Sequence, residues 1–503
     1  MPDIDKKRTG IDIHIPLLEV SEVGYVKDVR GGVARVNGLP SCIYGQFVEF
    51  SRGTRGLVTG FDTQEVLVII LGDESNIYVG DSVSSLSALV GISVGEKFLG
   101  RIVNSVAEPI DGMGEIRPSA FFPIFRPAPG VMEREPINEA LHTGIKLIDL
   151  LIPIGKGQRE LIIGDRQSGK SSICIDTIIN QKDKNVICIY CWVGGPKVAL
   201  KKVIAALSQH DAMKHTIIVA APAGSAAAEQ YMAPYTAATL GEYFMLNGRD
   251  VLIIFDDLTK HAWIYRQMSL LLERSPGREA YPGDIFYLHS QLMERAGRLK
   301  KELGGGSMTF LPIVETLQGD ITGYIQTNLI SITDGQIYIG SSIFREGFKP
   351  AIDLGLSVSR IGSKVQSSAI KEVSQGLRLE YAQYRETLRL TKLRTRLSTE
   401  AMEKMRRGDT LRTLLTQLNG HPISEIEEII LFYAFKRRIL EVVPPHILEK
   451  FIVEFFRDLS KENPQAVASL EANKDLTVDV KNELDKAFVR FFKAVESENG
   501  QNA

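Results

Sequence analysis

One stretch decides the fold of this protein: Gly164-Asp165-Arg166-Gln167-Ser168-Gly169-Lys170-Ser171, which matches GxxxxGK[ST] at every fixed position. The apolar run 161–163 precedes it, and the helix-like run 172–176 follows it. In this strand–loop–helix order, backbone N–H groups and the helix N-terminus cradle a phosphate, while Lys170 reaches the β/γ oxygens and Ser171 ligates Mg²⁺. The whole loop is therefore predicted to bind Mg-ATP (or ADP).

A second element of the same kind lies about 85 residues after the loop. The apolar run 251–255 ends at two acidic residues, Asp256 and Asp257. A carboxylate at the end of a buried strand can hold the Mg²⁺ shell beside the phosphates. We favour Asp256 as the metal-side carboxylate and Asp257 as a structural residue.

A group that activates water is missing from the place where we expect it. Hydrolysis needs a polar or charged group that orients and deprotonates the attacking water. The strand after the loop helix instead runs into Gly194-Gly195-Pro196, which has no carboxylate. The protein is therefore predicted to bind ATP without hydrolysing it efficiently, in a regulatory or partner-completing role.

Four segments of different pattern predict a multidomain protein of 503 residues. Residues 1–18 form an N-terminal extension. Residues 19–90 are short β-branched runs broken by Gly and Asp, which predict a small antiparallel barrel or sandwich, and we favour a β-barrel. Residues 91–368 alternate apolar strands with helices, which predicts an α/β P-loop (RecA-like) domain with a parallel sheet covered on both faces. Residues 369–503 are predicted to form an α-helical domain.

Capping signals mark the helices of this last segment. Ser424-Glu425-Ile426-Glu427 is predicted to open an apolar helix that runs through Leu440, and Pro444-Pro445 is predicted to close it. Two further helices are expected near 447–459 and 480–495.

Composition excludes several classes of protein. The 59 basic and 61 acidic residues give no reason to expect nucleic acid as a partner. Cys188 and Cys191 lie three apart in an apolar strand and so face opposite sides of the sheet, which predicts reduced, structural thiols. The N-terminus lacks a secretory signal, and no run approaches the ~18–20 apolar residues that span a bilayer. We expect a soluble protein that meets membranes only through a partner.

Several strings carry a closer resemblance: GDRQSGKS, LIIFDDLTKHA, RQMSLLLERSPGREAYPGDIFYLHS, ISITDGQI and PAIDLGLSVSRIGS. With the order of elements, they resemble the α subunits of F-type rotary ATP synthases, from about Glu19 to the C-terminal helices. The resemblance implies a ring in which α alternates with catalytic β subunits around a central-stalk γ subunit. It also implies peripheral-stalk partners and contact with the membrane only through the ion-translocating sector, on the cytoplasmic face of a bacterial plasma membrane or an organellar equivalent.

The resemblance also implies roles for residues outside the loop. The family's arginine finger falls on Arg360, where a planar cation enters the neighbouring subunit's site and stabilises charge on the transferring phosphoryl group. The adenine-contacting pair, near the start of the helical domain, falls on Gln417 and Asn419.

Some residues depart from the family's pattern. Gly195 stands where Gln is usual, which removes a polar contact near the γ-phosphate. Lys349 replaces Arg, Gln326 replaces Pro, and Ser171 replaces Thr while keeping the hydroxyl. Residues 1–18 lack the amphipathic helix that meets the peripheral stalk. These departures indicate a divergent or second-copy form of the complex.

Two other interpretations stay open. A self-sufficient hexameric P-loop ATPase, such as a secretion motor or a Rho-type RNA translocase, would need its own catalytic Glu, and the translocase would also need a basic, aromatic surface on its first domain. A pseudo-ATPase scaffold would bind no nucleotide, which Lys170, Ser171 and Asp256 argue against.

Overall fold

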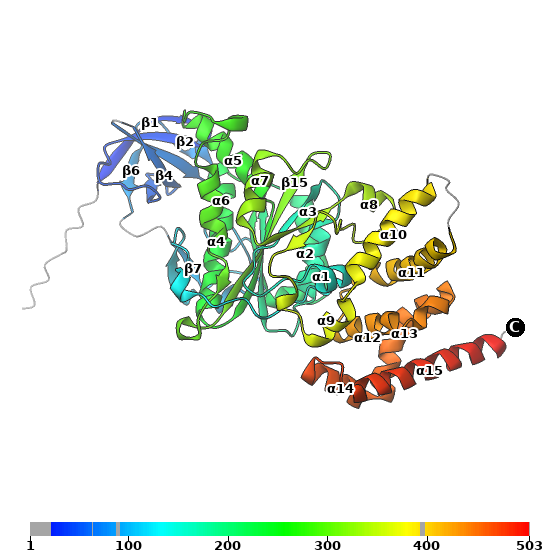
Figure 1. Ribbon diagram of the computed structural model, residues 1–503. Coiled ribbons are helices and arrows are strands. Elements are labelled where there is room, and N and C mark those ends of the chain that lie inside the picture. The colour runs from blue at the N-terminus through cyan, green and yellow to red at the C-terminus, as the bar shows by residue number, and fades with distance from the viewer. Residues whose placement is uncertain (1–21, 63, 87–90, 393–397, 502–503) are drawn as a thin grey trace, which may run out of the picture. The chain divides into compact units, whose positions relative to one another are not determined.

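The computed structural model describes residues 22–62, 64–86, 91–392 and 398–501 (Figure 1). The protein divides into two compact units, Met1–Leu89 and Val90–Ala503. The predicted extension 1–18 lies outside the described residues. The predicted order of β-barrel, α/β sheet and helices is confirmed, whereas the boundaries at 90/91 and 368/369 stay predictions.

The first unit is a closed six-stranded antiparallel barrel, with strand order β1-β2-β5-β4-β3-β6. Its core is lined mainly by valines, with Val36, Val48, Val58 and Val68 fully buried, because alternate residues of each strand face inward. The strands are β1 (Val23–Arg30), β2 (Val33–Asn37), β3 (Phe47–Phe50), β4 (Arg55–Phe61), β5 (Glu65–Leu71) and β6 (Ser82–Ser85). The β-branched runs 23–29, 33–36, 47–50 and 66–71 of the sequence predict β1, β2, β3 and β5, whereas β4 and β6 are additional.

The second unit is built on a mainly parallel sheet of order β17-β16-β10-β15-β13-β11-β12-β8, with β14 paired to β15. All eight residues of β11 are buried, as expected for a central parallel strand covered on both faces, and its two cysteines are free thiols. The strands are β8 (Ile102–Val103), β10 (Leu161–Asp165), β11 (Val186–Val193), β12 (Thr216–Ala221), β13 (Asp250–Asp256), β14 (Gly297–Arg298), β15 (Ser307–Thr316), β16 (Gly335–Ile339) and β17 (Val358–Ser359). A separate antiparallel pair consists of β7 (Gly91–Val94) and β9 (Ala120–Pro123).

Helices connect and cover these strands (Figure 1). They are α1 (Lys146–Leu151), α2 (Lys170–Ile179), α3 (Lys197–Gln209), α4 (Ala227–Leu246), α5 (Leu258–Leu271), α6 (Ile285–Met293), α7 (Tyr324–Ile332) and α8 (Ser341–Arg345). The helical part contains α9 (Ser368–Ser374), α10 (Leu377–Lys392), α11 (Thr399–Leu415), α12 (Glu425–Lys436), α13 (Pro445–Glu462), α14 (Pro464–Asn473) and α15 (Val478–Gln501).

The predicted end of the helix that Ser424 opens was wrong. Ser424 does cap α12, accepting a hydrogen bond from the N–H of Glu427, but α12 ends at Lys436 rather than at Leu440. Arg438 then takes a left-handed conformation with φ 61°. Pro445 does not close a segment but begins α13, because the first turn of a helix does not use the N–H that proline lacks.

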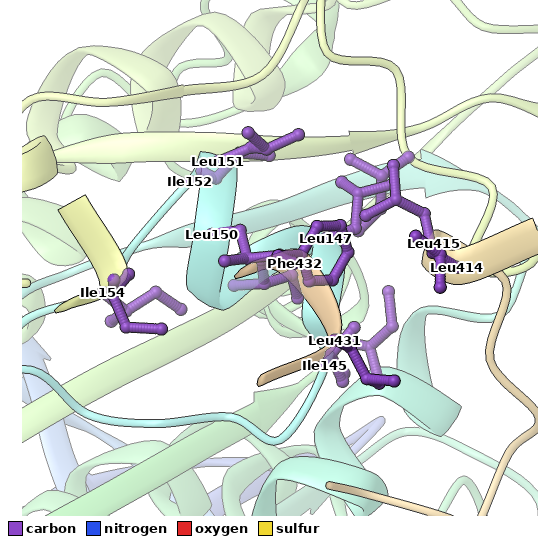
Figure 2. Packing of buried hydrophobic residues seen from close by; sticks show 14 of the residues in the cluster. Ile145, Leu147, Leu150, Leu151, Ile152, Ile154, Leu414, Leu415, Leu431 and Phe432 are labelled. Carbon is purple, nitrogen blue, oxygen red and sulfur yellow. The ribbon is translucent and has the colours of Figure 1, made fainter. Parts of the chain in front are cut away.

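One hydrophobic core joins the sheet to the C-terminal helices (Figure 2). Leu147 and Leu150 of α1 lie among Leu415 of α11 and Phe432 of α12, all of them buried. Each such side chain stabilises the fold by about 1.5–3 kcal/mol through burial alone. This packing fixes the segment after α11 against the sheet that carries the loop.

Candidate nucleotide-binding site

The loop Gly164–Ser171 lies between β10 and α2, as its sequence predicts. Gly169 has φ 102°, which is left-handed, and a Cβ built there would meet no atom within 4 Å. Glycine is therefore needed here for conformation, and the space above the loop is open. The first N–H groups of α2, like those at the start of any helix, lack intrahelical partners and can bind an anion.

The side chain of Lys170 is buried against the phosphate loop. Its Nζ donates hydrogen bonds to the carbonyl of Gly164 at 2.8 Å and to the carbonyl of Asp165 at 2.5 Å. Burial lowers the pKa of Lys170. The loop therefore holds its own lysine in place, and a bound phosphate would compete with two backbone carbonyls for the amine.

The side chain of Asp165 anchors the base of the loop. Its carboxylate accepts hydrogen bonds from Thr316 Oγ1 at 2.7 Å, Gly319 N at 2.8 Å and Ser341 Oγ at 2.7 Å. Partial burial acts to raise the pKa of Asp165, but these hydrogen bonds outweigh it and lower the pKa. Asp165 thus ties β10 to β15 and α8.

Ser171 and Asp256 meet at one point. Ser171 Oγ donates a hydrogen bond to Asp256 Oδ2 at 2.7 Å, and the hydroxyl of Tyr190 donates to the same oxygen at 2.6 Å. A hydroxyl and a carboxylate are hard oxygen ligands of the kind that Mg²⁺ prefers. The structure brings the two predicted metal-side residues together, while their role as ligands stays a prediction.

Asp257 has different surroundings, although it is the next residue. It caps α5 by accepting a hydrogen bond from Lys260 N at 2.8 Å and forms an ion pair with the Lys260 amine. Burial is the main cause that raises the pKa of Asp257 to about 6, against the opposing charge of Lys260. These contacts serve the start of the helix rather than the open space above the loop.

The turn after β11 offers no carboxylate. Gly194 N donates to the Ala221 carbonyl at 2.8 Å, and Ala223 N donates to the Gly195 carbonyl at 3.0 Å.

The carboxylate of Glu315, at the end of β15, accepts a hydrogen bond from Arg166 Nε at 2.8 Å. Sequence reasoning missed Glu315, whose proximity to the loop depends on strand order.

The predicted adenine residues lie in the segment between α11 and α12, not at the start of the helical part. Gln417 donates hydrogen bonds to the Gly144 carbonyl at 2.7 Å and to the His421 carbonyl at 2.8 Å, whereas Asn419 is exposed. Gly420 N in the same segment donates to Asp176 Oδ1 of α2 at 2.8 Å. The structure thus brings this segment to the loop helix, but no hydrogen bond joins Gln417 or Asn419 to the loop among the described residues.

Strand register places the segment before Arg360 at the end of the sheet opposite the phosphate loop. Gln336 of β16 pairs with Val358 of β17 on one side and with Leu161, the first residue of β10, on the other. Ile339, further along β16, pairs with Gly164, where the loop begins. Because β10 spans four residue steps, or about 13 Å, β17 lies level with the end of β10 that is opposite the loop.

Arg360 follows β17 directly and is exposed. Its backbone N–H donates to the Asp334 carbonyl at 2.8 Å, and its guanidinium makes no hydrogen bond or ion pair with any residue in the described parts of the protein. Ser359 beside it is fixed by donating to the Pro153 carbonyl at 2.8 Å. Glu160 behind it is fully buried, and burial raises its pKa well above the usual range although the charge of Arg360 opposes this.

Two aromatic residues beside the loop were also missed. Tyr190 donates a hydrogen bond to Asp256, and Trp263 of α5 lies under the Arg166 guanidinium, with 5.9 Å from Arg166 Cζ to the ring centroid. Alternation along a buried strand would have placed Tyr190 and Trp192 on one face, but no motif marks either of them.

Two kinds of feature are absent from the described residues. None of their helices is long and apolar enough to cross a membrane. Nor do three or more His, Cys, Asp or Glu side chains gather there in a cluster that could hold a metal ion.

Known protein families match all three parts of this sequence. Residues 19–87 match the β-barrel domain of the ATP synthase alpha/beta family, and residues 144–359 match its nucleotide-binding domain. Residues 366–491 match the C-terminal domain of ATP synthase alpha/beta chains.

Similar proteins match over nearly their whole length. ATP synthase subunit alpha of Caldanaerobacter subterraneus subsp. tengcongensis is 45% identical over 94% of both proteins. That of Petrotoga mobilis is 45% identical over 94% of the present sequence and 95% of its own. ATP synthase subunit alpha 1 of Mycoplasmopsis pulmonis is 46% identical over 94% and 90%. The chain therefore belongs to the ATP synthase alpha/beta family, as an alpha subunit of the F type.

Proposed function

We propose that this protein is the nucleotide-holding, non-hydrolysing subunit of a rotary ion-translocating ATP synthase. It binds Mg-ATP or ADP at Gly164–Ser171, and it supplies Arg360 to a neighbouring catalytic β subunit. The observation that carries the proposal is the position of Arg360: an exposed guanidinium that makes no hydrogen bond or ion pair within the described residues, at the end of the sheet opposite the loop.

An arginine in that position is suited to act on another subunit. Its guanidinium presents a planar, permanently charged fork of donors, which matches phosphate geometry. Aimed at a transferring phosphoryl group, such a finger contributes roughly 10³–10⁵ in rate. Because β17 lies level with the far end of β10, Arg360 is poorly placed to reach a phosphate bound on its own loop.

The residues beside the loop fit Mg²⁺. A magnesium ion in a phosphate-loop site takes few protein ligands and completes its shell with waters and phosphate oxygens. Ser171 Oγ would be the direct ligand, and Asp256, 2.7 Å from it, would accept from the metal's water shell. The bound ion would neutralise phosphate charge, while Lys170 would leave its two loop carbonyls to meet the phosphate.

The remaining roles follow from the alpha-subunit family. We propose that the protein alternates with catalytic β subunits around a γ subunit and meets peripheral-stalk subunits. We propose that it is peripheral to the membrane, on the cytoplasmic face, and contacts it only through the ion-translocating sector. Gln417 and Asn419 are proposed to meet the adenine, which requires Gln417 to exchange its hydrogen bond to Gly144 for one to the base.

The test uses the full-length protein alone and in the assembled complex. Alone, it should bind Mg-ATP and hydrolyse it negligibly. In the complex, Arg360→Ala should abolish ATP turnover while assembly and nucleotide binding persist, and Arg457→Ala, at an exposed arginine of α13, should change nothing. Full turnover with Arg360→Ala would contradict the finger assignment. Loop-dependent hydrolysis by the isolated subunit would favour a self-sufficient ATPase.

A further inference from the structure

The indole of Trp192 occupies the space that a side chain at position 195 would need. A Cβ built on Gly195 would lie 2.2 Å from Cζ2 and 2.5 Å from Cε2 of Trp192, far inside van der Waals contact. The backbone of Gly195 is not left-handed, so space rather than conformation explains the glycine. Trp192 and Gly195 are thus a matched pair, in which even a methyl group at 195 would displace the ring.

The same indole packs toward the candidate metal site. Trp192 is 6% exposed and stacks on Tyr190, with ring centroids 6.4 Å apart and planes 20° apart. Both side chains belong to one buried cluster, on one face of β11. The position of the indole therefore limits where the Tyr190 ring can lie.

Tyr190 connects the indole of Trp192 to the carboxylate of Asp256. Its fully buried hydroxyl donates to Asp256 Oδ2 at 2.6 Å, the oxygen that also accepts from Ser171. Trp192, Tyr190 and Asp256 form one series of contacts that ends at the loop hydroxyl.

We propose that Trp192 is a positioning residue for the metal-bound nucleotide: packed into the space beside Gly195, it holds Tyr190 and thereby orients Asp256. This deepens the proposed function and rests on it. The glycine at 195 is then not simply the loss of a polar side chain, because the indole takes its space and supports the Mg²⁺ side of the site.

The experiment measures ADP affinity of the full-length protein by calorimetry, with Mg²⁺ and with EDTA. The ratio of the two affinities reports on the metal side, which a merely structural role would leave unchanged. The variants are Gly195→Ala, Trp192→Leu, their combination and Trp192→Phe. Gly224→Ala is the matched control, because that exposed glycine lies in the adjacent turn and a Cβ there meets nothing within 4 Å.

Gly195→Ala should reduce the Mg²⁺-dependent gain in affinity by about 10- to 100-fold, the usual range when support of a metal site is lost. Trp192→Leu should also reduce it. The double variant should return to the level of Trp192→Leu, which we expect to lie above that of Gly195→Ala, because the shorter leucine leaves room for the methyl group. Trp192→Phe should retain most of the gain, and Gly224→Ala all of it.

Three outcomes are distinguishable. An unchanged Mg²⁺ gain in folded Gly195→Ala, or a double variant no better than Gly195→Ala, would overturn the inference while leaving the proposed function intact. A wild-type protein that binds no ADP at all would contradict the proposed function itself. Thermal unfolding of each variant separates loss of folding from loss of positioning. Where Gly195→Ala fails to fold, a folded Trp192→Leu with an unchanged Mg²⁺ gain would overturn the inference.

Discussion

The phosphate loop and the arginine segment lie at opposite ends of the same sheet, and their charged groups are satisfied differently. At the loop, the Lys170 amine, the Asp165 carboxylate and the Asp256 carboxylate each have hydrogen-bond partners within the protein. At the other end, Arg360 is held through its backbone and its neighbour Ser359, while its guanidinium has no such partner in the described part of the protein.

This difference supports the proposal that one subunit combines two roles. A site whose charges are balanced internally can keep its shape before a ligand arrives, and it can bind nucleotide by exchanging one set of hydrogen bonds for another. An exposed cation on a fixed backbone can form charge-assisted hydrogen bonds with another molecule. Under the proposed function, the loop holds the nucleotide and Arg360 acts on the neighbouring subunit.

The largest effect is expected from Arg360→Lys in the assembled complex. Lysine keeps the charge but loses the planar fork, so most of the roughly 10³–10⁵-fold contribution of a finger should disappear. Steady-state ATP turnover measures it, with ADP affinity of the isolated subunit as the control that should not move. Near-normal turnover would mean that only charge matters at this position and would weaken the comparison.

Lys170→Ala should show the opposite pattern. Removing the amine that is proposed to meet the phosphates should weaken nucleotide binding to the isolated subunit by about 10- to 100-fold, the value of a hydrogen bond to a charged group. Turnover of the complex should fall far less than with Arg360→Lys. Lys201→Ala, at an exposed lysine of α3, is the matched control. If both lysine variants bind nucleotide equally well, the loop is not the site.

A smaller effect is expected from Tyr190→Phe. Losing the hydroxyl that donates to Asp256 Oδ2 leaves that oxygen with Ser171 alone, which should cost about tenfold in Mg²⁺-dependent ADP affinity. Tyr235→Phe is the comparison, since its hydroxyl lies 3.4 Å from the Leu288 carbonyl. An equal loss in both variants would indicate general destabilisation instead.

Acid should destabilise the fold through two buried histidines, His261 of α5 and His289 of α6. Burial lowers the pKa of His261 to about 4 and that of His289 to about 3. The unfolded protein, with histidine pKa near 6.5, therefore takes up protons that the folded protein does not. Stability should be unaffected above pH 6.5 and should fall by about 1.4 kcal/mol per pH unit for each histidine below it, down to about pH 4.

Unfolding midpoints at several pH values measure this loss. His289→Gln should make the dependence shallower between pH 6.5 and 4 by removing one titrating group. His446→Gln, at an exposed histidine of α13, should leave the slope as it is. A slope that is unchanged in His289→Gln would show that the acid sensitivity lies elsewhere.

The local sequence pattern was sufficient to predict the elements that depend mainly on residues close together in the sequence. The loop, its flanking strand and helix, and the apolar strand ending at Asp256 follow from periodicity and from residue types with one strong local preference. The same reasoning failed near Arg438, where a left-handed residue ends the helix early, because arginine carries no signal for that conformation. It also missed β4, whose run Arg55–Phe61 contains two glycines, and β6, whose run Ser82–Ser85 contains one apolar residue; both are held by pairing in the barrel.

The sequence alone determined the family, the order of domains and the residues predicted to bind phosphate, because those depend on short runs whose chemistry is local. The tertiary structure decided what lies beside them: that Tyr190 shares an oxygen of Asp256 with Ser171, that Trp192 fills the space over Gly195, and that Arg360 lies at the far end of the sheet. Those relations depend on strand order and register, which join residues far apart in the sequence. No local pattern records them, since they arise only when the strands pair and their side chains are packed together.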